Sequence, residues 1–231
     1  MELSSLRVIH GRPVLYLEQT DSTNRVAREL AREGGLGVVV ADHQTAGRGR
    51  LGRSWASESG QNLLFSAILR PKLPATAAPR AVMIWAAAMA EALGVWVKWP
   101  NDLVDGSDLK LGGLLAELET QGDAVASVVL GVGLNVNQLE FPDLPAATSL
   151  ARLRGAPQDR VEVLRTLIGA IDRADLSAEG LELWRSRSRT LGRRVQVGDV
   201  LGLATGIRAD GALLIDGRPI LAGDVSLLGE T

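Results

Sequence analysis

Short apolar runs alternate with helical patterns along most of the chain. The runs of strand length are rich in valine, leucine or aromatic residues and end at glycine, proline or polar turn residues. This pattern predicts strands at residues 14–17, 38–41, 62–69, 95–99, 109–117 and 125–136. A glycine-containing turn at residues 105–108 precedes the fifth of them, which is therefore expected to pair with the preceding segment as a hairpin.

Four segments have the helical period instead. Residues 26–31 place their apolar side chains on one face, directly after a run of polar turn formers. Residues 79–93 are rich in alanine and almost entirely apolar, but they are too short to span a membrane, so a buried core helix is expected. Two further helices are predicted at residues 160–174 and 178–187.

Beyond residue 191 the pattern changes to very short strands separated by tight glycine-containing turns. These strands are predicted at residues 194–197, 200–207, 212–215, 219–221 and 225–228. Five such strands in a row fit a small barrel. The predicted fold class is α+β, with a mixed, mainly antiparallel sheet flanked by helices at residues 1–187 and a small barrel domain at residues 188–231.

The composition of the whole chain is ordinary, so any unusual chemistry is expected in local clusters of residues. The chain has 231 residues, a formal net charge of −2 and 46% hydrophobic residues, as in ordinary soluble proteins. That charge argues against a surface devoted to nucleic acid or anionic membrane. Without cysteine, thiolate nucleophiles and disulfides are excluded, and His10 and His43 are expected to be structural or exposed. No signal-peptide pattern is present, so a cytoplasmic location is expected.

The most unusual segment runs from Gln44 to Trp55 and is called the Gly/Arg loop below. Arg48, Arg50 and Arg53 alternate with glycines, which free the backbone, while each arginine carries a fork of donors that matches phosphate or carboxylate oxygens. Such a segment cannot bury its charges without a partner. It is either a solvated, mobile surface loop or a loop that binds an anion.

Four other polar clusters lie at the ends of predicted strands, at residues 22–24, 98–102, 110–113 and 131–137. Together with the Gly/Arg loop they supply cations, one carboxylate (Asp102), glycines and neutral amides. They contain no placed general base and no activated nucleophile. This inventory suits phosphoryl or adenylyl chemistry with a divalent metal, and it fits neither a hydrolase triad nor a P-loop. For residues 21–24 the alternative is simple capping of the helix that follows.

Lysine is scarce among the basic residues. Of the 25 Lys and Arg residues, only Lys72, Lys98 and Lys110 are lysines. Lysine offers a compact charge that arginine does not, so a lysine kept inside a polar cluster is a candidate chemical group.

Taken in order, the clusters resemble those of biotin protein ligases. They are Asp21-Ser22-Thr23-Asn24, Gln44-Thr45-Ala46-Gly47-Arg48-Gly49-Arg50-Leu51-Gly52-Arg53-Ser54-Trp55, Lys98-Trp99-Pro100-Asn101-Asp102, Lys110-Leu111-Gly112-Gly113 and Gly131-Val132-Gly133-Leu134-Asn135-Val136-Asn137. The resemblance covers about residues 13–150 and extends more loosely to the C-terminal strands. It implies a class II synthetase-like catalytic domain and an SH3-like C-terminal barrel.

The resemblance also implies a two-step, ATP-dependent reaction with Mg²⁺. Biotin and ATP would first form biotinyl-5′-AMP and pyrophosphate. The biotinyl group would then pass to one lysine of a biotin carboxyl carrier protein domain, as in acetyl-CoA carboxylase. Because the first catalytic strand is predicted near Val14, the monofunctional class is expected, with no DNA-binding repressor function. A homodimer formed through the catalytic sheet is also expected.

Site residues follow from the resemblance position by position. The catalytic residues would be Arg48, Lys98, Asp102 and Lys110, with Asp102 also holding the metal. Biotin would be bound by Ser22, Thr23, Asn24, Gln44, Arg48, Gly49, Arg50, Trp55, Lys110, Gly113, Gly131 and Gly133. The nucleotide would be bound by Arg48, Arg50, Arg53, Lys98, Asn101 and Asn135. The Gly/Arg loop is expected to be disordered in the empty enzyme and to close over biotin and the adenylate phosphate.

Some of these residues have ordinary structural alternatives. One of Trp96 and Trp99 is expected to fill the core, and Arg53 is either a ligand or a plain surface charge. Glu117 and Glu119 fit a solvated strand face.

Two other functions fit parts of the pattern. One is a lipoate–protein ligase of the same broad fold, against which stand the Gly/Arg loop and the 98–102 cluster. The other is a nucleic-acid-binding module that uses the Gly/Arg loop as an RGG-like segment. The net charge of −2 and the presence of one Tyr and two Phe for base stacking argue against it.

Overall fold

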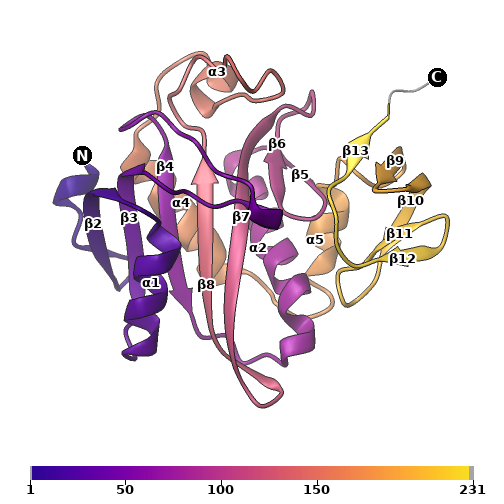
Figure 1. The fold of residues 1–231 in the computed structure, drawn as a ribbon, viewed down its shortest axis with the longest axis horizontal. Coiled ribbons are helices and arrows are strands. Elements are labelled where there is room, and N and C mark those ends of the chain that lie inside the picture. Colours follow the sequence, from indigo (N-terminus) through magenta and orange to yellow (C-terminus); the bar gives the residue numbers. More distant parts are fainter. Residues whose placement is uncertain (1, 229–231) are drawn as a thin grey trace.

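The computed structural model describes residues 2–228 as a large sheet covered by helices and joined to a smaller second sheet (Figure 1). The large sheet is mixed but mainly antiparallel, so the predicted α+β class is confirmed. Its strand order is β1-β2-β3-β4-β8-β7-β6-β5. The strands are β1 (Val8–Ile9), β2 (Arg12–Thr20), β3 (Gly37–Gln44), β4 (Leu63–Leu69), β5 (Trp96–Lys98), β6 (Asp102–Val104), β7 (Lys110–Gln121) and β8 (Ala124–Leu134).

Each predicted strand of this sheet is present. The turn before β7 joins β6 and β7 as the expected antiparallel hairpin. The parallel pair is β2 and β3, which are joined by a helical crossover. Strand β1 was not predicted, because its two residues are too few to give a periodic signal.

The helices are α1 (Thr23–Arg32), α2 (Ala78–Leu93), α3 (Leu150–Arg154), α4 (Arg160–Arg173) and α5 (Leu181–Ser186). Single 3-10 turns lie at Leu3–Ser5, Arg50–Gly52 and Ala75–Ala77. The helix expected at 178–187 is shorter than predicted, and α3 was missed because it is barely one turn long. No helix within residues 2–228 is long and apolar enough to cross a membrane.

The helices cover the two faces of the sheet unequally. Helices α2, α4 and α5 pack together on one face, where α2 is buried as a core helix, as predicted (Figure 1). Helix α1 packs alone on the opposite face against β3, β4 and β8, over a small cluster that includes Val39, Ile68 and Val129. Because α1 is short, much of its face of the sheet is left for loops.

The second sheet contains β9 (Arg194–Val197), β10 (Val200–Ile207), β11 (Leu213–Ile215), β12 (Arg218–Ile220) and β13 (Ser226–Leu227), in the order β12-β11-β10-β9-β13. All five predicted strands are present, with their ends within one residue of the prediction. Closure into a barrel and the domain boundary between residues 187 and 188 stay predictions.

The second sheet is attached to the first through the segment that precedes it. Val97 of β5 donates its N–H to the Arg187 carbonyl and accepts from the N–H of Arg189. Asp108, in the turn between β6 and β7, accepts hydrogen bonds from Arg189 and Arg193. The two sheets are therefore held side by side next to the end of β6.

Candidate active site

A continuous series of contacts links all five polar clusters on the face that carries α1. Asn24 lies against Gly131, and Gly133 lies against the ring of Trp55. Lys110 lies over the same ring, 5.8 Å from its centroid, and forms an ion pair with Asp102. The structure therefore brings together segments that are up to about a hundred residues apart in the sequence.

A buried network of neutral groups, called the amide pocket below, forms one end of this site. Gln44 Oε1 accepts from the N–H of Thr23 (2.7 Å) and from its hydroxyl (3.0 Å). Ser66 Oγ lies 2.8 Å from Thr23 Oγ1 and 2.6 Å from Asn24 Oδ1. Thr23, Asn24 and Ser66 are all buried. These side chains are held in place by one another before any ligand binds.

Ser66 was missed as a site residue. It lies in the centre of β4, whose seven residues are all buried, so a polar side chain there needs a buried partner. The signal in the sequence was a single serine within an otherwise apolar strand.

The capping interpretation of residues 21–24 is only partly correct. Ser22 is the N-cap residue of α1, but its side chain makes no capping hydrogen bond. Asp21 instead accepts from the N–H of Ser22 at 2.7 Å and from Arg25. The hydrogen bond from Arg25 is the main reason that the pKa of Asp21 is lowered to about 2. Thr23 and Asn24 are thereby left to point into the amide pocket.

Two glycines of β8 allow the walls of the site to come close together. A Cβ atom at Gly131 would overlap the side-chain amide of Asn24, and one at Gly133 would overlap the indole of Trp55. These positions need glycine for close approach, which explains the glycines inside an otherwise apolar strand.

Trp55 separates the amide pocket from the charged end of the site. Its backbone N–H donates to the Gly47 carbonyl at 2.9 Å, which closes the base of the Gly/Arg loop. Its indole Nε1 is buried and has no hydrogen-bond partner within residues 2–228. A buried donor of this kind is costly unless something accepts from it.

The charged end is built on the hairpin of β6 and β7. Lys110 Nζ donates to Asp102 Oδ1 at 2.8 Å. Gly113 lies directly beside this pair, since a Cβ there would be 3.3 Å from Asp102 Oδ1. Asn101 donates to the carbonyl of Leu114 and accepts from Arg50 at 3.0 Å, which ties the Gly/Arg loop to the hairpin.

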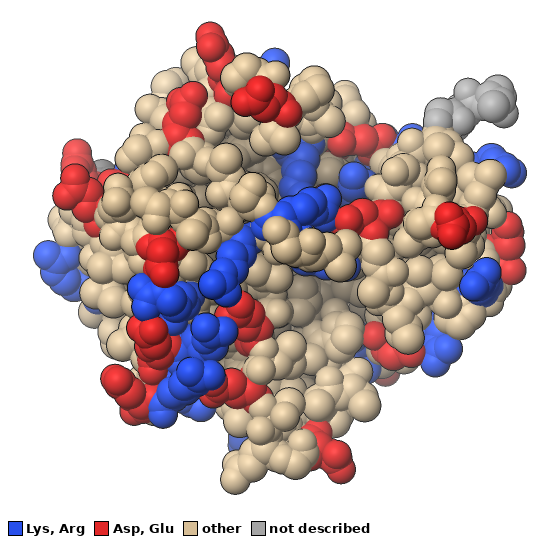
Figure 2. All heavy atoms as spheres, viewed as in Figure 1, with Lys and Arg blue, Asp and Glu red and all other residues tan. Residues whose placement is uncertain are grey.

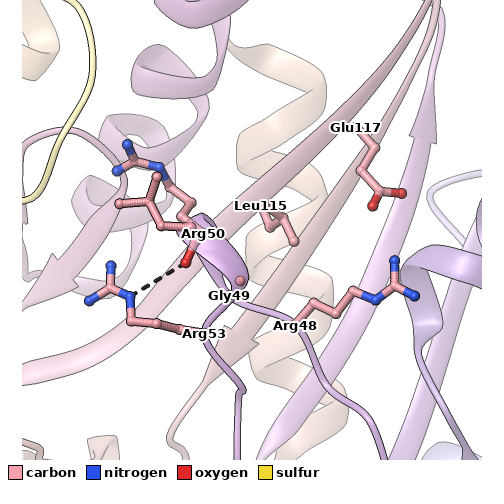
Figure 3. Close-up of a pocket in the computed structure, with 8 residues that line it drawn as sticks. Arg48, Gly49, Arg50, Arg53, Leu115 and Glu117 are labelled. Carbon is pink, nitrogen blue, oxygen red and sulfur yellow. Dashed lines mark hydrogen bonds between the residues drawn. The ribbon is translucent and has the colours of Figure 1, made fainter.

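The Gly/Arg loop passes over a cavity of about 460 Å³ that is lined by residues 48–53, Leu115 and Glu117. Figure 3 shows Arg48 and Arg50 extending from the loop in opposite directions, with Arg48 on the side of Glu117. Figure 2 shows basic side chains in a band across this face, along α1 and the loop, with a hollow beside the second sheet. Within residues 2–228, the Arg48 side chain has no hydrogen bond or ion pair, so its guanidinium is available for an anion.

Several predicted residues have contacts that the sequence did not suggest. The side chain of Asn135 is buried and donates to the Thr148 carbonyl at 3.0 Å, so one of its two amide N–H groups is already used. Arg53 pairs with Asp224 of the second sheet, so it is more than a plain surface charge. Lys98 lies at the end of β5, and no side-chain partner is found for it within the described residues.

The structure also decides between the alternatives for the two tryptophans and the two glutamates. Trp99 is buried in the core and Trp96 is not, as expected for one of the two. Glu117 and Glu119 are not a plain solvated face, because they pair with Arg28 and Arg32 of α1.

The described residues contain no group of three or more His, Cys, Asp or Glu side chains that could hold a metal by themselves. Asp102 is the carboxylate next to the cations, and one of its oxygens already accepts from Lys110. Mg²⁺ is commonly bound by one or two carboxylates together with substrate phosphates and water. Asp102 therefore fits a magnesium ion that arrives with a nucleotide.

Comparisons with known proteins identify a family for the chain. Residues 16–135 match the model of the biotin/lipoate A/B protein ligase family. The chain is 35% identical to the bifunctional ligase/repressor BirA of Bacillus subtilis over 95% of this chain and 75% of that protein. It is also 35% identical to the biotin–[acetyl-CoA-carboxylase] ligase of Mycobacterium tuberculosis, over 90% of this chain and 86% of that one.

A solved structure of similar fold is the biotin protein ligase of Aquifex aeolicus in complex with biotin and ATP. Its TM-score is 0.72 at 30% identity, over 94% of this chain and 99% of that chain. The likeness therefore covers both sheets.

Proposed function

This chain belongs to the biotin/lipoate A/B protein ligase family, and we propose that it is the ligase that joins biotin to a carrier protein. In the first step a carboxylate oxygen of biotin attacks the α-phosphorus of ATP, and pyrophosphate leaves. In the second step the amine of a carrier lysine attacks the acyl carbon of biotinyl-5′-AMP, AMP leaves and the amine loses a proton. The proposed carrier is the biotin carboxyl carrier protein domain of acetyl-CoA carboxylase.

The observation that carries the proposal is the junction between the amide pocket and the charged end at Trp55. Biotin is a neutral bicyclic urea that carries a carboxylate on an apolar chain. The amide pocket offers buried, preorganised polar groups for the urea, and Lys110 lies next to the Trp55 ring to receive the carboxylate. A site of this shape suits a ligand with one neutral and one anionic end.

The cations support the first step. The carboxylate of biotin and the phosphates of ATP repel each other, so positive charge must hold both before the attack. Charge develops on the equatorial oxygens of the α-phosphorus, where donors such as Lys110 and Arg48 stabilise the transition state most. Arg50, Arg53, Lys98, Asn101 and Asn135 are proposed to surround the nucleotide, with Asn135 held in place by its hydrogen bond to the Thr148 carbonyl.

Asp102 is proposed to act in both steps. With the phosphates it would hold Mg²⁺, which neutralises phosphate charge when it is bound. Its carboxylate lies beside Lys110 and is half-buried, so it can also attract and orient the lysine amine of the carrier in the transfer step.

The test is a reconstitution with purified components. The chain is incubated with ATP, Mg²⁺, biotin and an apo carrier domain, and the carrier is analysed by intact mass spectrometry. We expect one biotinyl group per carrier, and none on a matched carrier whose target lysine is replaced by arginine. A parallel reaction with lipoate in place of biotin separates the two ligase activities. Lipoylation without biotinylation would overturn the proposal.

A further inference from the structure

The Gly/Arg loop also contacts the second sheet. Arg53 Nη2 and Asp224 Oδ2 are 2.7 Å apart, and Arg50 Nη1 lies 3.8 Å from the other carboxylate oxygen of Asp224. Arg50 Nη2 also donates to the carbonyl of Gly223 at 3.2 Å. These contacts, called the Asp224 clasp below, join segments that are 171 residues apart in the sequence.

The second sheet holds its side of the clasp in a fixed position. Gly223 has φ +137°, a conformation that residues with a side chain rarely adopt, and a Cβ there would overlap Val197 of β9. Val225, on the other side of Asp224, is buried. Asp224 is therefore placed between two residues whose positions are set by packing, while its carboxylate stays exposed.

Residues 48–53, at the tip of the loop, have little else to hold them. Within its 3-10 turn no residue is buried, and Leu51 has a left-handed backbone (φ 55°) with 71% of its surface exposed. Among residues 48–53, the side chains with hydrogen bonds or ion pairs to the rest of the described chain are Arg50 and Arg53. Apart from Asn101, their partners belong to the clasp.

The geometry points to Asp224 as a positioning residue for the Gly/Arg loop, a proposal that rests on the ligase function above. Asp224 holds two arginines at the end of the loop nearest the second sheet and so keeps the loop across the cavity. Arg48, which faces the cavity, is left unpaired and can take the adenylate phosphate. The second sheet thus contributes to catalysis by keeping the adenylate enclosed, without touching it.

Removing the charge of Asp224 should change how long biotinyl-5′-AMP stays bound but not how fast it forms. Asp224→Asn keeps the size of the side chain but loses the ion pairs, so the loop should open more often. We expect release of biotinyl-5′-AMP to be about five- to tenfold faster, as for the loss of a weak ion pair or two. The single-turnover rate of adenylate formation at saturating biotin and ATP should change less than about twofold, because no group that touches the reactants is altered.

The matched control is Asp199→Asn. Asp199 is an exposed aspartate in the turn between β9 and β10 of the same sheet, and it makes no hydrogen bond or ion pair within residues 2–228. Asp199→Asn should behave as the wild type in both measurements. Asp224→Glu, which restores the charge, should recover most of the retention, whereas a purely structural role of Asp224 would not predict this rescue.

A second readout does not depend on the ligase function. The 231-residue chain without ligands is digested briefly with trypsin, and cleavage after Arg48, Arg50 and Arg53 is followed by mass spectrometry. Asp224→Asn should be cut several times faster than Asp199→Asn at these sites and equally fast elsewhere. If the carrier is not biotinylated but cleavage rises, the clasp stands and the proposed function fails.

The proposal for Asp224 would be overturned if Asp224→Asn did not differ from its control. Equal cleavage and equal adenylate release for Asp224→Asn and Asp199→Asn would show that Asp224 does not position the loop. If Asp224→Asn lowers the melting temperature, Arg53→Ala breaks the same ion pair from the exposed side of the loop. Because Arg53 and Asp224 share one ion pair, the double variant should then release adenylate more slowly than the two single effects multiplied together, and fully additive effects would contradict the proposal.

Discussion

The amide pocket and the Gly/Arg loop differ in how far each is organised before a ligand arrives. In the amide pocket the polar groups are buried on the sheet and already bonded to one another. In the loop the cations alternate with glycines on an exposed 3-10 turn, and Arg53 keeps 57% of its side chain exposed. A buried surface such as the amide pocket, whose groups are already bonded to one another, is suited to the neutral part of a ligand. A charged and reactive part needs groups that can close around it and release it.

The two regions should therefore respond differently to the same kind of change. Changes in the pocket should act on biotin binding through packing and hydrogen bonds, which salt does not screen. Changes at the charged end should act on ATP, adenylate and rate. Single substitutions in the two regions test this division.

Removing the lysine at the junction should have the largest effect. Lys110→Ala removes the cation next to Trp55 and leaves Asp102 without its partner, so adenylate formation should fall by about 10³-fold. The rate is measured as pyrophosphate release in a single turnover. The control is Lys72→Ala, since Lys72 is exposed and lies outside the site. A rate near that of the wild type would remove Lys110 from the reaction.

Filling the space at Gly131 should mainly weaken biotin binding. In Gly131→Ala the new methyl group overlaps the amide of Asn24, which must move and lose contacts with Ser66. Overpacking of this kind costs roughly 1–3 kcal/mol, which corresponds to about fivefold to 150-fold in affinity. Calorimetry with biotin alone measures the effect.

The control for that experiment is Gly106→Ala, where the nearest heavy atom to a new Cβ is Trp96 Nε1 at 3.9 Å. This change should leave biotin affinity unaltered. Equal affinities for the two variants would show that Gly131 and Asn24 are not in the biotin pocket.

Removing the unpaired arginine of the loop should act on the adenylate instead. Arg48→Ala loses one charge-assisted hydrogen bond to the phosphate, so biotinyl-5′-AMP should be released about tenfold faster, with the fold intact. High salt should speed release from the wild type more than from Arg48→Ala, because one of the screened charges is already absent in the variant. Unchanged retention of the adenylate would contradict the assignment of the loop.

The smallest effect should come from Asp21, at the start of α1. Its pKa is lowered to about 2 from an ordinary 3.8, chiefly by the hydrogen bond from Arg25. A lowered folded-state pKa stabilises the fold above the unfolded-state value, and this stabilisation is lost as the pH falls through about 2. The melting temperature of Asp21→Asn should therefore be slightly below that of the wild type at pH 6, and this difference should disappear between about pH 4 and pH 2. If the difference in melting temperature does not change with pH, the charge of Asp21 does not contribute to stability.

The sequence predicted the local structure well because short-range patterns decide it. The period-2 and helical patterns placed the strands of both sheets and the buried helix α2, and glycine-containing turns marked where strands end. The failures were the elements too short to show a period, β1 and α3. The clusters of the site were also visible. Glycine weakens a strand unless another group must come close to it, and clustered arginines cannot be buried without anionic partners.

The order and the composition of the polar clusters can be read from the chain without coordinates. Which side chains meet depends on the folded sheets: Ser66 with Asn24, Lys110 with Trp55, and Asp224 with Arg53. The physical reason is that strand pairing brings together residues far apart in the chain, and no local pattern records which side chains will then be within a few ångströms. For the Gly/Arg loop, the sequence indicated arginines suited to anions, and the structure showed that one such anion, the Asp224 carboxylate, is already part of the protein.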